Sequence, residues 1–354
     1  MRSRAVLLAV FLLVIACAPA QPAVRSSAAA VTASPTLAAT PTPSPTATPS
    51  PVPTPKPIAD VIAQIDLAKM EAHLNALTAV GSRDPRHPGH AKAVAYIKQQ
   101  IAAIPGLVIT SQLASYQGIP LENILVTVPP EGPAREGFLG GVGMICAHYD
   151  STANRTPGWR PALDPAPGAD DNATGTAALL EFARILAADR TSLNHPVVLA
   201  FFDGEEFFFK GSAAYLTGAP QPNPFKWVID IDMVGFNPIA DRLDLIYYTQ
   251  RSATLRDRVK AANQRYAIGV NPLVEQLATS GETILDAAPF GLAGIPSVAL
   301  VQRYGENDAT FPGNYTFHTV NDTPDKITNK RLWVKAAKLT LATALELSRG
   351  NDQL

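Results

Sequence analysis

The chain has 354 residues, of which 47% are hydrophobic and 17% are charged, and its formal net charge is −1. With neither a basic stripe nor a large positive charge, the sequence gives no reason to expect a nucleic-acid partner. The length allows two domains of about 150 residues each, although α/β folds often extend further as one domain.

Residues 1–16 have the features of a secretory signal peptide, which is removed and takes no part in the fold. Arg2 and Arg4 give it a positive start, and the apolar stretch that follows is shorter than the roughly 20 residues needed to span a bilayer. Its end resembles a bacterial lipobox, which implies cleavage before Cys17 and lipid attachment to the Cys17 sulfur. The protein is therefore expected to be exported, extracytoplasmic and attached to a membrane only through Cys17. The alternative is a secreted protein that is cut after the Ala-x-Ala-like site at 18–20.

Residues 17–57 form a low-complexity segment in which, from Ser34 onward, proline alternates with threonine, serine and alanine. Such a composition cannot bury a core and favours extended polyproline II, so the segment is expected to be a spacer between the lipid and the folded domain. A glycosylated stalk is the alternative. Beyond Cys17 the only cysteine is Cys146, so no internal disulfide is expected, and its apolar neighbours predict a thiol buried in a strand.

The remaining residues, 58–354, are predicted to fold as one domain. Apolar residues between Ile58 and Leu77 recur every three or four positions and predict an amphipathic helix that Gly81 terminates. Strands that alternate with helices predict an α/β domain with a mostly parallel central sheet. Further helices are predicted at 91–104, 173–188, 255–266 and 330–349, and strands at 107–115, 123–128, 138–148, 196–202, 227–233, 242–248 and 296–301.

Two adjacent glutamates, Glu205 and Glu206, follow the apolar strand predicted at 196–202. In open α/β sheets, ligands bind beyond the carboxyl ends of the strands. Acidic side chains there cost free energy unless they meet a cation, a partner or a reacting group. The ordinary alternative is a solvated first turn of a helix, where glutamate is favoured.

Four other segments place acidic residues or histidines at the ends of predicted elements. Each has an ordinary explanation when taken alone, since aspartate commonly caps helices and a histidine can be a satisfied polar residue. Together they favour a metal site, and oxygen and imidazole ligands without thiolate suit Zn²⁺ in a hydrolytic site. The segments contribute, in chain order, His148 with Asp150, Asp170 with Asp171, Asp230 with Asp232, and His318. The other histidines have no acidic residue at ligand spacing and are expected at the surface: His73, His87, His90 and His195.

The chain resembles the co-catalytic di-zinc aminopeptidase family in five motifs, namely AHYDS, PGADDNATG, FDGEE, IDMVG and FHTVNDTPDKI. This family includes bacterial secreted leucyl-type aminopeptidases and is related to glutamate carboxypeptidase II, the transferrin receptor's protease-like domain and the glutaminyl cyclases. The resemblance covers most of residues 58–350. It implies a three-layer α/β/α sandwich of the zinc-peptidase type, with a mixed, mostly parallel central sheet, and peptide substrates with a free N-terminus.

The resemblance also implies two Zn²⁺ per chain and a role for each motif residue. His148 and Asp232 would hold one zinc, Glu206 and His318 would hold the other, and Asp171 would bridge the two. The bridging residue would be joined to the next residue by a cis peptide bond.

Two further carboxylates are implied to serve catalysis without binding metal. Glu205 would be the general base that takes a proton from the attacking water. Asp150 would orient His148, since metal-bound imidazole usually donates its other ring N–H to a carboxylate or carbonyl.

The sequence departs from the family at two positions. Phe317 stands where the family often has a tyrosine that helps to stabilise the oxyanion, and only Tyr315, another residue or the metals could take that role. Ala287 replaces a histidine that the family often carries after the aspartate that is retained here as Asp286. Because this region shapes the substrate pocket, the preferred N-terminal residue is not predicted.

The sequence therefore predicts a metallo-exopeptidase that removes N-terminal amino acids from peptides. One alternative is a glutaminyl-peptide cyclotransferase, and another is a non-catalytic binding protein on the same fold. The complete set of five ligands argues against a cyclase that uses one zinc, and the intact Glu205 argues against a binding protein. The oligomeric state is not predicted.

Overall fold

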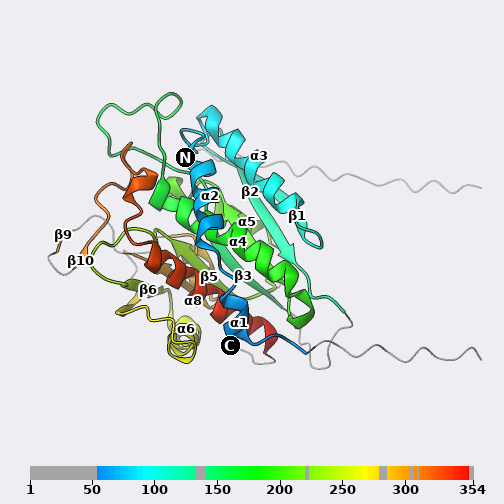
Figure 1. Cartoon of the computed structure of the whole chain (residues 1–354). Coiled ribbons are helices and arrows are strands. Elements are labelled where there is room, and N and C mark those ends of the chain that lie inside the picture. The colour runs from blue at the N-terminus through cyan, green and yellow to red at the C-terminus, as the bar shows by residue number, and fades with distance from the viewer. Residues whose placement is uncertain are drawn as a thin grey trace, which may run out of the picture. The chain divides into compact units, whose positions relative to one another are not determined.

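The computed structural model of the protein describes residues 54–132, 141–219, 223–278, 285–302, 307–308 and 311–350. Within these ranges, an eight-stranded sheet forms the centre in the order β1-β2-β4-β3-β5-β8-β6-β7 (Figure 1). Four neighbouring pairs are parallel and three are antiparallel, so the predicted mixed, mostly parallel sheet is confirmed. The strands are β1 (Val108–Tyr116), β2 (Ile119–Val128), β3 (Val142–His148), β4 (Val197–Phe202), β5 (Phe225–Asp232), β6 (Leu243–Tyr247), β7 (Leu273–Leu277) and β8 (Ser297–Val301), with a separate small ladder of β9 (Asn307–Asp308) and β10 (Phe311–Pro312).

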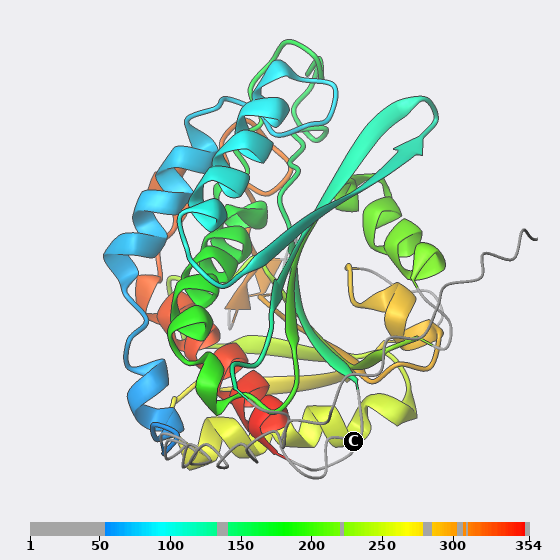
Figure 2. The same cartoon turned by 90° about the vertical axis from the view of Figure 1, so that its right-hand side faces the viewer.

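Helices cover both faces of the sheet, which confirms the predicted three-layer α/β/α sandwich. In Figure 2, α5 and α7 lie to the right of the sheet, and α2, α3 and α4 lie to the left. The two hydrophobic cores agree with this arrangement, because α5 and α7 pack into one core and the other helices into the other. The helices are α1 (Ile58–Ile62), α2 (Leu67–Thr78), α3 (Pro88–Ala102), α4 (Thr174–Ala188), α5 (Lys210–Gly218), α6 (Ala253–Arg265), α7 (Ala288–Leu292) and α8 (Lys330–Arg349).

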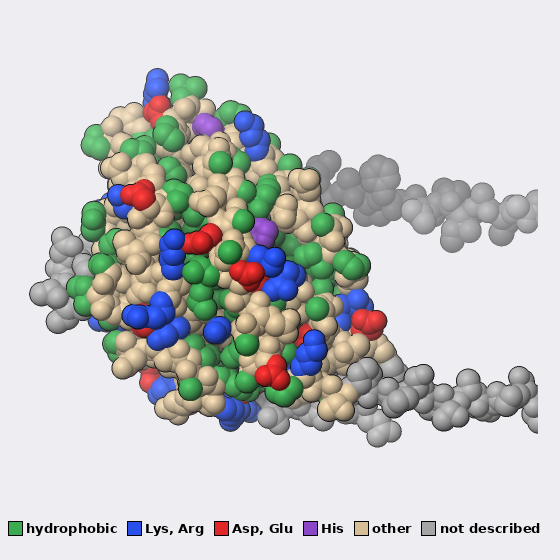
Figure 3. Space-filling model, in the orientation of Figure 1, with side chains coloured by type: hydrophobic (Ala, Val, Ile, Leu, Met, Phe, Trp, Pro, Cys, Tyr) green, Lys and Arg blue, Asp and Glu red, His purple; other side chains and the backbone are tan. Residues whose placement is uncertain are grey.

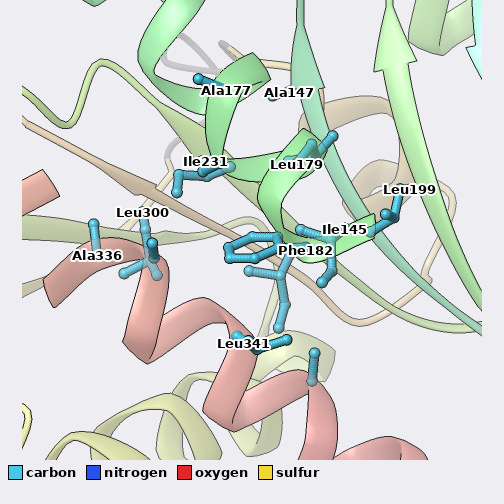
Figure 4. Packing of buried hydrophobic residues seen from close by; sticks show 14 of the residues in the cluster. Ile145, Ala147, Ala177, Leu179, Phe182, Leu199, Ile231, Leu300, Ala336 and Leu341 are labelled. Carbon is cyan, nitrogen blue, oxygen red and sulfur yellow. The ribbon is translucent and has the colours of Figure 1, made fainter. Parts of the chain in front are cut away.

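The two cores follow from the alternation of side chains along each strand. In β3, Ile145 belongs to the larger core, while Met144 and Cys146 belong to the smaller one, because successive residues of a strand point to opposite faces. Figure 4 shows Ile145 of the larger core beside Phe182 of α4 and near Leu341 of α8. The predicted buried thiol is confirmed, since Cys146 has no exposed surface.

The prediction of a single helix between Ile58 and Leu77 is wrong, because this segment forms two helices, α1 and α2. Asp66 caps the second helix, and its side chain accepts hydrogen bonds from the N–H groups of Ala68 and Lys69 at 2.9 and 3.4 Å. Aspartate favours such a cap because its side chain satisfies N–H groups that the first helical turn leaves unpaired. The sequence prediction also missed α5, α7 and β7, which are all short.

The predicted signal peptide, Cys17 and nearly all of the predicted spacer lie outside the described residues. Within the described ranges, no helix combines the length and the apolar composition needed to cross a membrane. The face in Figure 3 carries acidic and basic side chains interspersed among apolar and neutral ones. This face therefore carries no large patch of a single charge sign.

Candidate metal centre

Three neighbouring parallel strands, β4, β3 and β5, bring the predicted site residues to one edge of the sheet. His148 is the last residue of β3 and Asp232 is the last residue of β5. Strand β4 ends at Phe202, and Glu205 and Glu206 follow in a short 3₁₀ turn, Glu205–Phe207. Because parallel strands end on the same side, side chains that are far apart in sequence meet at this edge.

Five of the predicted residues form two clusters that share Asp171. In the first cluster, Nε2 of His148 lies 3.2 Å from Oδ1 of Asp171 and 3.5 Å from Oδ1 of Asp232. In the second, Nε2 of His318 lies 3.0 Å from Oδ2 of Asp171 and 2.9 Å from Oε2 of Glu206. The structure thus groups the residues in the two sets that the family resemblance implies, with Asp171 offering one carboxylate oxygen to each.

The chemistry of these side chains fits a zinc site. Oε1 of Glu206 is buried without a hydrogen-bond partner. Nε2 of His148 and Oδ1 of Asp232 are buried without a hydrogen bond of good geometry, and their polar contacts are those at 3.2 and 3.5 Å within the first cluster. A buried polar atom left in this way costs about 1–3 kcal/mol, so native structures rarely keep several together without a reason. Imidazole nitrogens and carboxylate oxygens are common zinc ligands, and coordination would satisfy these atoms.

The charges within the cluster shift the pKa values of its members. For Asp171, burial acts to raise the pKa, but the contacts with His148 and His318 outweigh it and hold the pKa below the usual range. Burial raises the pKa of Glu206 to about 7 despite the nearby His318. For His318, burial acts to lower the pKa, but the carboxylates of Glu206 and Asp171 outweigh it and raise the pKa to about 11. The close contacts between carboxylates and imidazoles therefore shift the pKa values of Asp171 and His318 in opposite directions.

Two carboxylates hold the loops that carry these residues. Oδ1 and Oδ2 of Asp150 accept hydrogen bonds from the N–H groups of Glu205 and Glu206, each at 3.2 Å, and Nδ1 of His148 lies 3.3 Å from Oδ1. Asp150 therefore contacts both the imidazole that it was predicted to orient and the turn that carries the two glutamates.

Asp322 holds the opposite loop in the same way, although the sequence did not single it out. Its Oδ1 and Oδ2 accept hydrogen bonds from the N–H groups of Asp170 and Asp171 at 3.1 and 3.0 Å. The peptide bond from Asp171 to Asn172 is cis, as the family resemblance implies. The position of Asp322, four residues after His318, was the available sequence signal.

The sequence analysis singled out two pairs of aspartates, Asp170 with Asp171 and Asp230 with Asp232, and only one member of each pair lies in a cluster. Asp170 points away from the clusters, and its Oδ2 accepts hydrogen bonds from Nε2 of Gln302 at 2.6 Å and Nδ2 of Asn314 at 2.8 Å. Asp230 accepts a hydrogen bond from the N–H of Ala287 at 3.1 Å, and burial raises its pKa to about 7. Of these four aspartates, only Asp171 and Asp232 contact the histidines of the clusters.

The expectation that His90 lies at the surface is wrong. Its side chain is 12% exposed, and its Nε2 lies 2.9 Å from Oδ2 of Asp203 and 3.1 Å from the hydroxyl of Tyr149. Burial acts to lower the pKa of His90, but the hydrogen bond with Asp203 outweighs it and raises the pKa. The sequence gave no sign of this contact because 113 residues separate the partners. The other three histidines also lie outside the clusters: His73, His87 and His195.

A buried arginine that the sequence analysis did not single out ties two site segments together. Arg83 is fully buried, and its guanidinium donates hydrogen bonds to the backbone oxygens of Tyr149, Pro167 and Gly168 at 2.6, 2.5 and 2.8 Å. Tyr149 follows the ligand candidate His148, and Gly168 leads into the turn that carries Asp171. Burial lowers the pKa of Arg83 to about 10, which leaves it charged at neutral pH.

A pocket of about 260 Å³ opens over the clusters. One side is apolar, and Phe317 lies on it, whereas Tyr315 is 60% exposed and does not line the pocket. Tyr315 therefore does not face the clusters as a replacement for the tyrosine that the family often has. The lining consists of Asn154, Asp171, Glu205, Glu206, Phe208, Phe209, Asp232, Met233, Leu285, Phe317 and His318.

Comparison with known proteins agrees with this geometry. The model of peptidase family M28 matches residues 123–343, which include every residue of the two clusters. The chain belongs to peptidase family M28. This assignment accounts for the arrangement of carboxylates and imidazoles at the carboxyl ends of β3, β4 and β5.

Two curated proteins illustrate the sequence similarity. The chain is 29% identical over 242 residues to leupeptin-inactivating enzyme 1 of Streptomyces exfoliatus, covering 66% of this chain and 48% of that protein. It is 25% identical over 303 residues to leucine aminopeptidase 1 of Arthroderma otae, covering 82% and 76% respectively. Across four curated relatives, among them the endoplasmic reticulum metallopeptidase 1 of rat, the chain spans only 20–48% of the relative's length.

Solved structures share the fold at low sequence identity. The LapA aminopeptidase of Legionella pneumophila matches with a TM-score of 0.65 and 18% identity, over 83% of this chain and 75% of that one. The glutaminyl cyclase of Porphyromonas gingivalis matches with a TM-score of 0.64 and 18% identity, over 80% of this chain and 99% of that one. At these identities the likeness establishes the fold alone.

Proposed function

We propose that the protein is a zinc-dependent aminopeptidase that removes N-terminal amino acids from peptides. The observation that carries the proposal is the shared Asp171, which joins two sets of metal ligands beneath one pocket. Membership of peptidase family M28 and the aminopeptidase names among the relatives support the same reaction.

In this proposal the chain holds two zinc ions. His148 and Asp232 would be ligands of one, Glu206 and His318 would be ligands of the other, and Asp171 would contribute to both. Zinc bound in such paired sites polarises the scissile carbonyl and lowers the pKa of bound water. The ligand count, one shared carboxylate and two further residues for each ion, leaves positions open for water and substrate.

Glu205 is assigned the proton transfers. It lines the pocket but belongs to neither cluster, so its carboxylate is free to accept the proton of the attacking water and pass it to the departing amine. Burial acts to raise the pKa of Glu205 above its usual range. Asp150 fixes the turn of Glu205 through two backbone hydrogen bonds, so the base is held in place before substrate binds.

The proposed function is tested with pairs of substrates that differ only in whether the N-terminal amine is free or acetylated. The zinc-loaded protein should cleave aminoacyl amides and short peptides with a free amine, and it should not cleave the same peptides after N-acetylation. A free amine would be required because it would be held at the metal clusters, where an acetylated nitrogen would be a poor ligand. Equal cleavage of free and acetylated peptides would contradict an aminopeptidase.

A glutaminyl-peptide cyclotransferase remains the second candidate, because the glutaminyl cyclase of Porphyromonas gingivalis shares this fold. The same set of substrates, extended with N-terminal glutaminyl peptides, separates the two activities. Cyclisation without cleavage, together with one zinc per chain, would favour the cyclase. Absence of both activities and of bound zinc would favour a binding protein on this fold.

We also propose that the mature protein is an extracytoplasmic lipoprotein anchored through Cys17. The support is the lipobox-like segment before Cys17 and the proline-rich spacer after it. One acyl chain binds a membrane only marginally, so stable attachment requires the additional chains of a lipidated cysteine. In fractionated cells, the wild-type protein should be found with membranes and the Cys17→Ser variant should not. Wild-type protein found mainly in the medium would support the secreted alternative instead.

A further inference from the structure

Phe208 combines two unfavourable features at the mouth of the pocket. Its backbone is left-handed, with φ 63° and ψ 56°, a conformation that favours glycine because a side chain crowds the following carbonyl. Its side chain is also 72% exposed, so a large apolar ring gains little from burial. Neither feature stabilises the fold, and strained backbone of this kind is concentrated at functional sites.

The surrounding loop holds Phe208 in this conformation. The N–H of Phe209 donates to the oxygen of Glu205 at 2.7 Å, and the N–H of Lys210 donates to the oxygen of Gly204 at 2.9 Å. The preceding residue is also held in place, because the ring of Phe207 contacts the Arg86 guanidinium at 5.2 Å and the Tyr116 ring at 5.9 Å. The ring of Phe208 is therefore presented to solvent from a fixed backbone.

The pocket has a buried end and an exposed rim. Met233 and Leu285 are 4% and 6% exposed and lie at the buried end, whereas Phe208 and Asn154 are exposed lining residues. At about 260 Å³, the pocket falls just below the roughly 300–1,000 Å³ typical of ligand pockets and is suited to a single residue. A peptide whose amine lies at the clusters would fill the buried end with its first residue, and its second residue would pass the rim.

We propose, resting on the aminopeptidase function above, that Phe208 is a specificity-determining residue that packs against the side chain of the substrate's second residue. An exposed phenyl ring gains most from apolar and aromatic partners, since both remove apolar surface from water and aromatic pairs add a favourable edge or stacking contact. The enzyme therefore prefers peptides with an apolar or aromatic residue after the scissile bond.

The test uses the zinc-loaded, full-length protein and dipeptide amides that share leucine as the first residue. The wild type should cleave those with phenylalanine or leucine second more efficiently than those with glycine or glutamate second. Phe208→Gly should lower kcat/KM for the phenylalanine substrate about two- to tenfold, mainly through KM, and leave the glycine substrate unchanged. Phe208→Trp should retain the preference, and Leu113→Ala, a change of an equally exposed apolar residue outside the pocket lining, should have no effect.

Stability distinguishes this role from a structural one. Glycine accepts a left-handed backbone, so Phe208→Gly should not lower the melting temperature. A clear loss of stability, an equal loss of activity on all four substrates, or an unchanged preference for the second residue would overturn the inference. A wild type that cleaves none of these amides would overturn the proposed function itself, and the inference with it.

Discussion

Glu205→Gln should lower kcat by about 10²–10⁴-fold, the usual contribution of general acid–base catalysis, while the two zinc ions of the proposed function stay bound. The amide cannot accept the proton of the attacking water, yet it has nearly the same shape as the carboxylate. Because Glu205 belongs to neither cluster, its loss removes no ligand. The measurements are kcat and KM on an aminoacyl substrate and zinc content by elemental analysis.

The control for this variant is Glu71→Gln, which changes a glutamate in an ion pair with Lys330 on the outer helices. It should keep near-normal kcat and full zinc content. If Glu205→Gln kept most of its activity, or lost zinc, the assignment of Glu205 as the base would fail.

Asp171→Asn should remove nearly all bound zinc, whereas Glu206→Gln should remove about one of the two ions. The difference follows from the geometry, since Asp171 contributes to both clusters and Glu206 to one. A neutral amide keeps the shape of the side chain but is a poorer ligand than a carboxylate. Zinc content of both variants, purified side by side with the wild type, measures the effect directly.

The same pair of variants should differ in stability. A ligand that binds only the folded state stabilises it by about 2.7 kcal/mol when its free concentration is 100 times its Kd. Asp171→Asn should therefore melt several degrees below the wild type and respond little to a chelator, while the wild type should lose stability on chelation. Equal zinc loss in the Asp171 and Glu206 variants would contradict the shared-ligand arrangement.

The residues of the two clusters could be predicted because their signal is local. All but His318 follow or end a predicted strand or open a helix, and histidine or aspartate inside an apolar context is costly without a purpose. The choice of one ligand from each adjacent acidic pair came from the family resemblance. The central strands β3 and β4 were predicted because they are nearly continuous apolar runs of the kind that parallel sheets bury on both faces. Strand β5 is apolar apart from Lys226, Asp230 and Asp232.

The residues that support the clusters could not be predicted, because their partners are distant in sequence. Arg83 donates hydrogen bonds to backbone oxygens 66–85 positions away, and Asp322 accepts hydrogen bonds from N–H groups about 150 positions away. His90 was misjudged for the same reason. A proline- and glycine-rich surrounding segment suggested a surface loop, while the burial of His90 comes from β4 and its following turn.

Short helices and strands were the other part of the fold that could not be predicted from the sequence. Helix α7 has five residues and contains Pro289 and Gly291, which are poor helix formers, so its existence depends on packing against the sheet. Strand β7 pairs with β6 alone at the sheet edge, and three of its five residues are intermediate in burial, which weakens the alternation that marks a strand.

The burial of Cys146 makes this thiol an intrinsic reporter of unfolding. It lies without exposed surface in β3, paired on both sides by β4 and β5, and burial raises its pKa well above the usual range. A thiol reagent reacts with the thiolate, so alkylation requires these strands to separate. Since β3 ends two residues later at His148, the alkylation rate with and without zinc would measure how strongly the metal holds the central strands together.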